Sequence, residues 1–152
     1  MENIHETIQE AREELKRADH LLFVSLKYTR TSEVIKSIVE RLASTIGLLI
    51  EALLKKAEKD GKIEIIPASP GHRCESVKKL YSEEQVQEMA NFCLSLRKIL
   101  RSNTNSQSEY RRHVTLIVEM DDGELEINMP LIHAYYEKTK GYTVYVRELV
   151  GE

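Results

Sequence analysis

Residues 31–60 carry the longest regular apolar pattern in the chain. Apolar side chains recur there every three or four residues, which places them on one face of an α-helix. The main row is Ile35, Ile38, Leu42, Ile46, Leu49 and Leu53, and a second row is Val34, Val39, Ala43, Ile50, Leu54 and Ala57. A helix that is apolar over more than one stripe needs more than one packing partner. The pattern therefore predicts a central helix that the rest of the chain covers.

Both ends of this predicted helix carry boundary signals. Thr31 or Ser32 offers a hydroxyl oxygen to the free amides of the first turn, and Glu33 suits the positive helix start. Gly61 can adopt the left-handed conformation that often ends a helix. Gly47 lies mid-helix at a cost of roughly 1 kcal/mol relative to alanine. It is either a weak point or a place where a second backbone approaches closely, and we favour close approach.

The segment before the central helix predicts its antiparallel partner. Its apolar seam alternates by four and three residues through Ile4, Ile8, Ala11, Leu15, Ala18, Leu22 and Ser25. This heptad spacing is typical of a helix that packs along another helix. Only the short connection 27–30 separates the two segments, so we expect a helical hairpin.

Two further helices are predicted in the middle of the chain. Residues 73–80 fit two turns with Cys74, Val77 and Leu80 facing inward. Residues 82–85 (Ser-Glu-Glu-Gln) form a capping box, which predicts a helix that begins there and ends near Arg101. Residues 102–108 have no apolar side chain and predict a solvated loop or a frayed continuation of that helix.

The pattern then changes to the period of two that is typical of strands. Apolar residues alternate on both sides of Asp122-Gly123, a two-residue hairpin signal, so residues 113–129 predict a β-hairpin. With that turn Met120 faces Leu125, and Val118 correspondingly faces Ile127.

The C-terminal segment, residues 130–150, allows two interpretations. Pro130 suits a first helical turn, and the following apolar spacing fits one helix. The Tyr-Thr-Val-Tyr-Val run after Gly141 fits a short helix plus a strand instead. We favour the single helix. The predicted fold is mainly α: an antiparallel helical bundle over residues 1–101 built on the long N-terminal hairpin, then a C-terminal β-hairpin and a final helix. We expect one domain over residues 1–152.

Composition and charge limit the compartment and the partners. The net charge of −3 argues against general nucleic-acid binding by the whole chain. We find no apolar run of membrane-spanning length and no signal peptide, so a cytoplasmic protein is expected. Cys74 and Cys93 have no metal or redox spacing, and two buried free thiols are the expected state. A disulfide between them is an alternative.

A cluster of basic residues before the hairpin is the main candidate binding site. It comprises Arg97, Lys98, Arg101, Arg111, Arg112 and His113, with Tyr110 able to stack on a base. Such residues suit phosphate or nucleic acid. The alternatives, which we favour, are a solvated basic loop that neutralises the acidic C-terminal segment and a core-facing Tyr110. Arg30, in the bend before the central helix, is a second candidate for anion binding, unless the bend only caps the helix.

Other chemistry has little support in the residues. The acids at positions 119, 121, 124 and 126 surround an exposed turn but match no calcium loop, so we predict no metal site and no cofactor. A metal-dependent module stays a third hypothesis. Nucleophile motifs, a P-loop and a dinucleotide fingerprint are absent, which makes an enzyme the less favoured interpretation.

Residues 1–101 also resemble a known superfamily. The resemblance rests on the helical hairpin, in which Ala11, Leu15, Ala18 and Leu22 face residues 35–53, on the proline-containing connection 66–70 and on the short helix 74–80. This arrangement resembles the HEPN superfamily of helical bundles, found in prokaryotic toxin–antitoxin and RNA-processing systems. The segments Tyr28-Thr29-Arg30-Thr31 and Tyr110-Arg111-Arg112-His113 resemble an uncharacterised archaeal family.

The HEPN resemblance implies binding rather than catalysis for this chain. Ribonuclease members carry an arginine four to six residues before a histidine, and no such pair occurs here, because Arg111 and Arg112 are too near His113 and Arg101 is too far. What the resemblance implies is dimerisation and a binding role. Our leading hypothesis is a non-enzymatic helical interaction protein that acts as a homodimer, because the first two helices carry excess apolar surface and the chain has no complete catalytic set. The alternative is an RNA- or nucleotide-binding protein, in one version a nuclease, that uses the cluster at residues 97–113.

Overall fold

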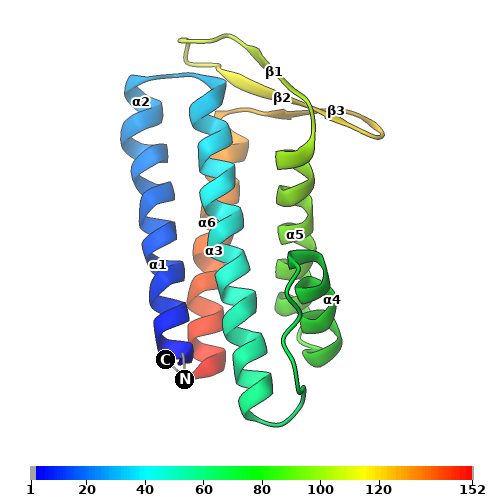
Figure 1. Ribbon diagram of the computed structural model, residues 1–152. Coiled ribbons are helices and arrows are strands. Elements are labelled where there is room, and N and C mark those ends of the chain that lie inside the picture. Colours follow the sequence, from blue (N-terminus) through cyan, green and yellow to red (C-terminus); the bar gives the residue numbers. More distant parts are fainter. Residues whose placement is uncertain (1–2, 152) are drawn as a thin grey trace.

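The computed structural model describes residues 3–151, and one long helix forms its centre. The helices are α1 (Ile4–His20), the π-helical turn η1 (Leu21–Ser25), α2 (Leu26–Tyr28), α3 (Ser32–Lys59), α4 (Pro70–Leu80), α5 (Glu84–Arg101) and α6 (Met129–Val150). In Figure 1, α3 runs down the middle with α1 on one side, α5 and α4 on the other, and α6 behind. The predicted fold class, mainly α with a late sheet and a final helix, is confirmed.

The apolar rows of α3 are buried as predicted. All six residues of the main row are completely inaccessible to solvent, and in the second row only Val34 is partly exposed. This burial has several sources, because α1, α4, α5, α6 and the sheet all contact α3. Each completely buried leucine or isoleucine contributes roughly 1.5–3 kcal/mol relative to an exposed one. The central helix is thus the main part of the hydrophobic core.

The ends of α3 follow the predicted signals, but its middle does not. The Thr31 hydroxyl accepts a hydrogen bond from the Val34 N–H, and Gly61 has a φ of 76°, in the left-handed region. Gly47 was expected to admit a second backbone, and this is wrong. A Cβ built at Gly47 has nothing within 4 Å. The residue faces a groove between α3, α4 and α5.

The predicted N-terminal hairpin is present, with one local difference. α1 packs antiparallel to α3, as the heptad seam indicates. The seam predicts Ser25 inward, but the π-helical turn η1 adds one residue to the turn and shifts the later side chains around the axis. Leu26, rather than Ser25, is therefore completely buried.

The two middle helices begin differently from the prediction. α4 starts three residues early, at Pro70, because the Ser69 hydroxyl caps it by accepting from the His72 N–H at 3.3 Å. The capping box at residues 82–85 does not form: α5 starts at Glu84, and Glu83 makes no side-chain cap. Instead, the Gln87 side-chain amide donates 2.7 Å hydrogen bonds to two carbonyls at the end of α4, those of Lys78 and Tyr81. This amide satisfies carbonyls that the end of α4 would leave free.

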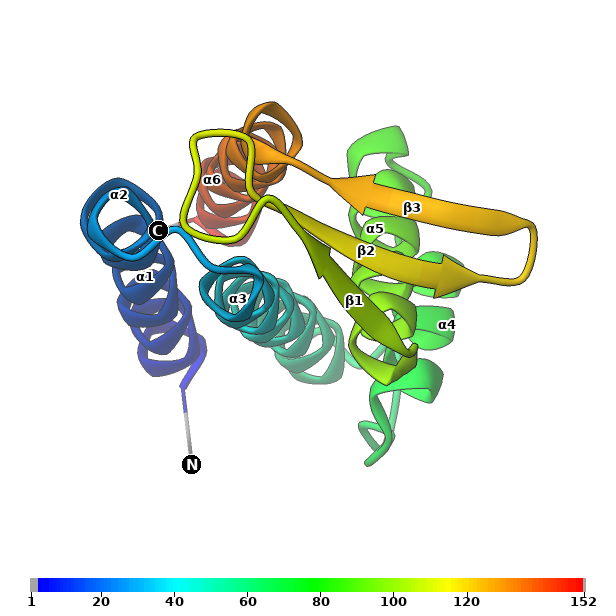
Figure 2. The same cartoon turned by 90° about the horizontal axis from the view of Figure 1, so that it is seen from above.

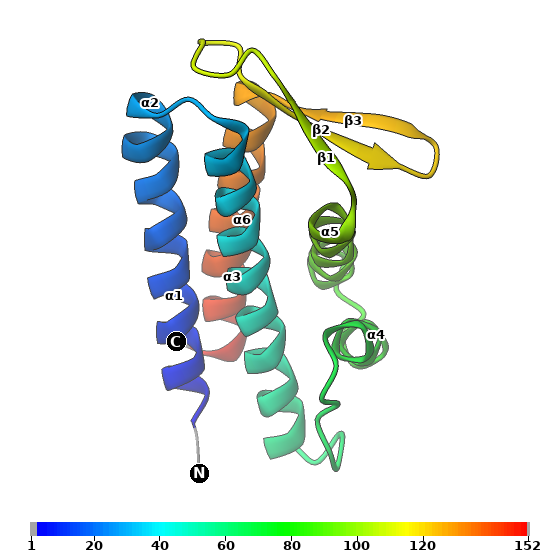
Figure 3. The same cartoon turned by 45° about the horizontal axis from the view of Figure 1, so that its top comes forward.

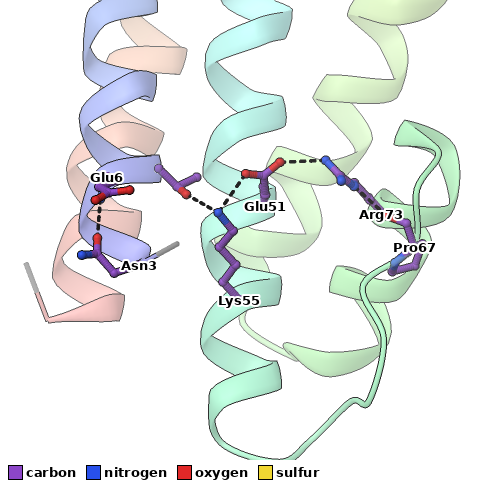
Figure 4. A network of polar contacts seen from close by, with 7 residues as sticks. Asn3, Glu6, Glu51, Lys55, Pro67 and Arg73 are labelled. Carbon is purple, nitrogen blue, oxygen red and sulfur yellow. Dashed lines mark hydrogen bonds and ion pairs between the residues drawn. The ribbon is translucent and has the colours of Figure 1, made fainter. Parts of the chain in front are cut away.

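A polar network holds the segment before α4 against α3 (Figure 4). The Glu51 carboxylate on α3 binds both Lys55 at 3.2 Å and Arg73 at 2.9 Å. Arg73 also donates to the Pro67 carbonyl, and Lys55 donates to the Thr7 hydroxyl on α1. Five residues thus connect α1, α3 and the chain that leads into α4.

The sheet has three antiparallel strands in the order β1-β2-β3. They are β1 (Thr104–Gln107), β2 (Thr115–Met120) and β3 (Gly123–Ile127). The sheet lies across the end of the bundle where α3 and α6 begin and α5 ends (Figure 3). The prediction of a loop over residues 102–108 is wrong, because β1 forms through backbone hydrogen bonds to β2 and needs no apolar side chains. Its polar residues are mostly exposed, as suits an edge strand.

The turn of the β2–β3 hairpin lies one residue earlier than predicted, which changes the pairing of the two strands. The turn residues are Asp121 and Asp122, and Gly123 pairs with Met120 with a φ of 132°. Val118 therefore lies opposite Leu125 instead of the predicted Ile127. Each residue's partner moves by two positions, so the same side chains stay on the buried face.

The two interpretations of the C-terminal segment are resolved in favour of one helix. α6 runs without interruption from Met129 to Val150 and includes Gly141. The Asn128 side chain caps its start by accepting from the Leu131 N–H at 3.0 Å, and Gly151 ends it with a φ of 84°. Across residues 3–151, no helix has both the length and the apolar character needed to cross a membrane.

Candidate functional site

The loop between β1 and β2 is docked onto the start of α3. The Glu109 carboxylate accepts a hydrogen bond from the Ser32 N–H at 3.0 Å, and the Tyr110 N–H donates to the Arg30 carbonyl at 2.5 Å. Hydrogen bonds from Ser32 are the main reason that the pKa of Glu109 is lowered. A carboxylate at a helix start is also favoured by the helix dipole. The two segments, 77 residues apart along the chain, thus become neighbours.

This docking joins two sets of candidate residues that the sequence presents separately. We call the result the bend–loop surface and define it by Tyr28, Arg30, Tyr110, Arg111, Arg112 and His113. All of these residues are exposed except Arg30, which is half-buried. Seen from above, the loop lies beside the connection from α2 to α3 (Figure 2). The surface therefore combines three arginines and a histidine with two aromatic rings.

Tyr110 points into solvent, not into the core. Its side chain is 76% exposed, and that of Tyr28 is 81% exposed. The alternative of a core-facing Tyr110 is therefore wrong. Tyr110 has a φ of 64° and Ser108 one of 59°, both in the left-handed region that non-glycine residues rarely adopt. Such conformations cost about 1–3 kcal/mol each and persist where surrounding contacts hold them. Here the hydrogen bonds to Ser32 and Arg30 hold the loop.

The other half of the basic cluster lies elsewhere. Arg101 ends α5, and the four residues of β1 carry the chain roughly 13 Å onward before the loop begins. Lys98 forms a 2.8 Å ion pair with Asp121 in the β2–β3 turn, and this hydrogen bond lowers the pKa of Asp121. Arg97 is half-buried beside the groove that Gly47 faces. The structure therefore joins Arg111, Arg112 and His113 to Arg30 and separates them from Arg97 and Arg101.

A second group of cations cannot be found from the sequence. A groove of about 280 Å³ between α1 and α6 is lined by Arg12, Lys16, Lys140 and Arg147, with Asp19 as the one acid among its lining residues. The Nε atom of Arg147 is buried and has no hydrogen-bond partner within the described chain. More than a hundred residues separate the two helices, so no sequence pattern connects these side chains.

The α3–α4–α5 groove is larger and chemically mixed. Its volume is about 350 Å³, and its lining includes Glu51, Arg73, Arg97, Cys74 and Cys93. Within residues 3–151, no three histidine, cysteine or acidic side chains gather closely enough to hold a metal ion. The acids around the β2–β3 turn therefore do not converge on a cation there.

Comparison of the chain with protein-family models, with curated proteins and with solved structures gives no match.

Proposed function

We propose that this protein binds single-stranded RNA through the bend–loop surface. The observation that carries the proposal is the hydrogen bond from the Tyr110 N–H to the Arg30 carbonyl, which places both aromatic–basic segments at one end of the bundle. Sequence-tolerant binding of single strands combines cationic side chains along the phosphates with aromatic rings on which bases stack. The bend–loop surface offers both.

Each side chain has a distinct part in the proposed complex. The rings of Tyr28 and Tyr110 stack on bases, each stack contributing about 1–3 kcal/mol. The guanidinium groups of Arg30, Arg111 and Arg112 bind phosphate oxygens in forked pairs. The net charge of −3 limits this attraction to the local surface. We propose binding only and no cleavage step, because the arginine–histidine spacing of HEPN ribonucleases is absent.

The resemblance to the HEPN superfamily supports this proposal, but the proposal does not depend on it. Non-catalytic members of that superfamily have binding roles, and a long helical hairpin followed by short helices is what the resemblance rests on. The two segments that resemble an archaeal family are the ones that meet in the bend–loop surface. We therefore also propose that their pairing serves the binding role.

Replacing Arg111 and Arg112 by alanine is expected to weaken binding of a labelled oligouridylate on the order of tenfold at low salt. Two lost phosphate contacts should also reduce the slope of log affinity against log salt by about 1.4. Filter binding across a salt series measures both quantities. The matched control is Lys16→Ala with Lys140→Ala, which removes the same charge from exposed residues of the α1–α6 groove.

Stacking is tested separately at Tyr110. Tyr110→Ala is expected to weaken binding by several-fold or more, whereas Tyr110→Phe keeps the ring and should bind like the wild type.

If the Lys16→Ala, Lys140→Ala double variant loses affinity and the Arg111→Ala, Arg112→Ala double variant does not, the interface lies on α1 and α6. Our assignment of the bend–loop surface is then wrong. Undetectable binding of the wild type at low salt would contradict the proposed function as a whole.

Homodimerisation is a second candidate function, which one observation favours. Most apolar residues of α1 and α3 are covered within the chain, so little of the excess apolar surface expected on these helices is left for a second copy. Exposed apolar side chains nevertheless border the junction of α1 and α6. Phe23 packs edge-on against Tyr136 of α6, and Val144 lines the groove two turns further along that helix. We propose this strip as the contact between two copies.

Light scattering coupled to size exclusion tests the dimer. The wild type is expected to have twice the mass of one chain at micromolar concentration, and Phe23→Glu with Val144→Glu is expected to give monomers, because a buried unpaired charge opposes association. Ile65→Glu is the control, since Ile65 is also apolar and is more exposed than Phe23 or Val144 but lies in the connection before α4. A monomeric wild type would rule out this candidate.

A further inference from the structure

The only two cysteines of the chain meet in the folded protein. Cys74 lies on α4 and Cys93 on α5, 19 positions later, and both are free and buried. A hydrogen bond between the two thiols is the largest influence on both of their pKa values. Both side chains also line the α3–α4–α5 groove. Two thiols that meet beside one groove are the arrangement from which a disulfide can form.

The surroundings of the two thiols differ, which gives each a separate role. The hydrogen bond from Cys93 lowers the pKa of Cys74, and the positive charges of Arg97 and Lys78 lower it further. The same hydrogen bond and burial raise the pKa of Cys93. Thiolates, not thiols, attack disulfides. Cys74, which also has Lys78 one turn further along α4, is the candidate for the attacking group, and Cys93 is the candidate for the group that resolves the mixed disulfide.

We propose that Cys74 and Cys93 form a reversible dithiol–disulfide site that exchanges with small disulfides such as oxidised glutathione. The Cys74 thiol loses its proton to water, and the thiolate attacks one sulfur of the small disulfide. The S–S bond breaks, and one small thiolate leaves with the electron pair and takes up a proton. Cys93 then loses its proton to water and attacks the Cys74 sulfur of the mixed disulfide. The second small thiolate leaves and takes up a proton. The two protein thiols are oxidised to one disulfide, and the small disulfide is reduced to two thiols.

The groove provides the route for this reagent. Arg97 lines it and can pair with a carboxylate of a reagent such as oxidised glutathione. Arg73 and the acids Glu40 and Glu51 also line the groove, and Arg73 is already paired with Glu51. Gly47 keeps the α3 wall open, since nothing lies within 4 Å of a Cβ built there. Cys74 is 1% exposed and Cys93 2% exposed, so the first step requires the groove to widen until the reagent reaches Cys74. The second step requires only that Cys93 reach its neighbour. The product covalently links α4 to α5.

Intact mass after alkylation tests the proposal on the complete wild-type chain. The protein is incubated with mixtures of oxidised and reduced glutathione, quenched in acid, unfolded and alkylated. In oxidising mixtures we expect both alkylation sites to be lost together, with the mass of two hydrogen atoms removed and no glutathione attached. A reducing agent should restore both sites. Two alkylated thiols at every ratio, or a lasting glutathione adduct on the wild type, would overturn the proposal.

Single variants test the separate roles. Cys93→Ser is expected to accumulate one glutathione on Cys74, and Cys74→Ser is expected to react several-fold more slowly at Cys93. Within the Cys93→Ser background, Arg97→Gln should slow adduct formation several-fold. Arg101→Gln should not, because Arg101 is exposed and does not line the groove. Equal rates for the two single cysteines would overturn the assignment of Cys74 as the attacking group. Equal effects of the two arginine variants would overturn the role of Arg97.

Discussion

Raising the pH from about 10 to about 12 is expected to destabilise the fold strongly, because tyrosine hydroxyls are buried in it. Tyr81, Tyr136 and Tyr142 are each at most 8% exposed. Burial is the main reason that the pKa values of Tyr81 and Tyr142 are raised to about 12. The pKa of Tyr136 is raised as well, first by burial and then by its hydrogen bond to Asp19.

The sign of the effect follows from which state loses protons first. Below the ordinary tyrosine pKa, near 10, the hydroxyls are protonated in both states and their contribution to stability is complete. Above it the unfolded chain loses these protons and the folded chain does not, so the free energy of unfolding falls by about 1.4 kcal/mol per pH unit for each tyrosine. For Tyr81 and Tyr142 together the loss by pH 12 is roughly 5 kcal/mol. That is comparable with the whole stability of a small domain, about 5–15 kcal/mol.

Urea unfolding at a series of pH values measures this loss, and two conservative variants separate its causes. Tyr142 has no hydrogen-bond partner for its buried hydroxyl, so Tyr142→Phe should stabilise the protein at neutral pH by about 1 kcal/mol. The Tyr81 hydroxyl donates to the Leu53 carbonyl at 2.7 Å, so Tyr81→Phe should cost about 1 kcal/mol there. Both variants should lose less stability than the wild type above pH 10. An unchanged slope in both would contradict the burial of these hydroxyls.

The parts of the fold that the sequence predicts are those where side-chain periodicity decides the structure. The rows along α3 and the apolar alternation in β2 and β3 are read correctly because burial selects the faces of these elements. β1 escapes prediction because its four polar residues are ordered by backbone pairing to β2, which leaves no pattern in the side chains. The π-helical turn after α1 likewise has no signature in a heptad seam. It shows only through the burial of Leu26 in place of Ser25.

The candidate site also could not be predicted in full, because its residues come from segments that are far apart in the sequence. The residue types at Arg30 and at residues 110–113 indicate phosphate chemistry. Only the hydrogen bonds of Glu109 with Ser32 and of Tyr110 with Arg30 show that the two segments meet. Proximity along the chain suggests that Arg97 and Arg101 form one cluster with Arg111. In the structure, strand β1 lies between them and separates them. For a related reason the sequence allows both free thiols and a disulfide for Cys74 and Cys93. A spacing of 19 residues across two helices does not fix whether the side chains face each other.

The core face of α3 itself can be tested with two adjacent leucines. Leu49 is completely buried, whereas Leu48 is partly exposed and lines the α3–α4–α5 groove. Leu49→Ala should cost about 3–4 kcal/mol, because it removes buried methyl groups and leaves a cavity that close-packed neighbours cannot fill. Leu48→Ala makes the same chemical change one residue earlier and should cost about 1 kcal/mol or less, since solvent already reaches that position.

Urea midpoints of the two leucine variants, compared at equal denaturant slope, give the difference directly. The loss in Leu49→Ala would take away a large part of the total stability, so partial unfolding at elevated temperature is expected for that variant alone. Because neighbouring helix positions point about 100° apart, only one of the two leucines can occupy the centre of the core-facing stripe. Equal costs, or a larger cost for Leu48→Ala, would mean that α3 is rotated about its axis relative to the packing described here. The groove that Gly47 and Cys93 share would then not exist in that form.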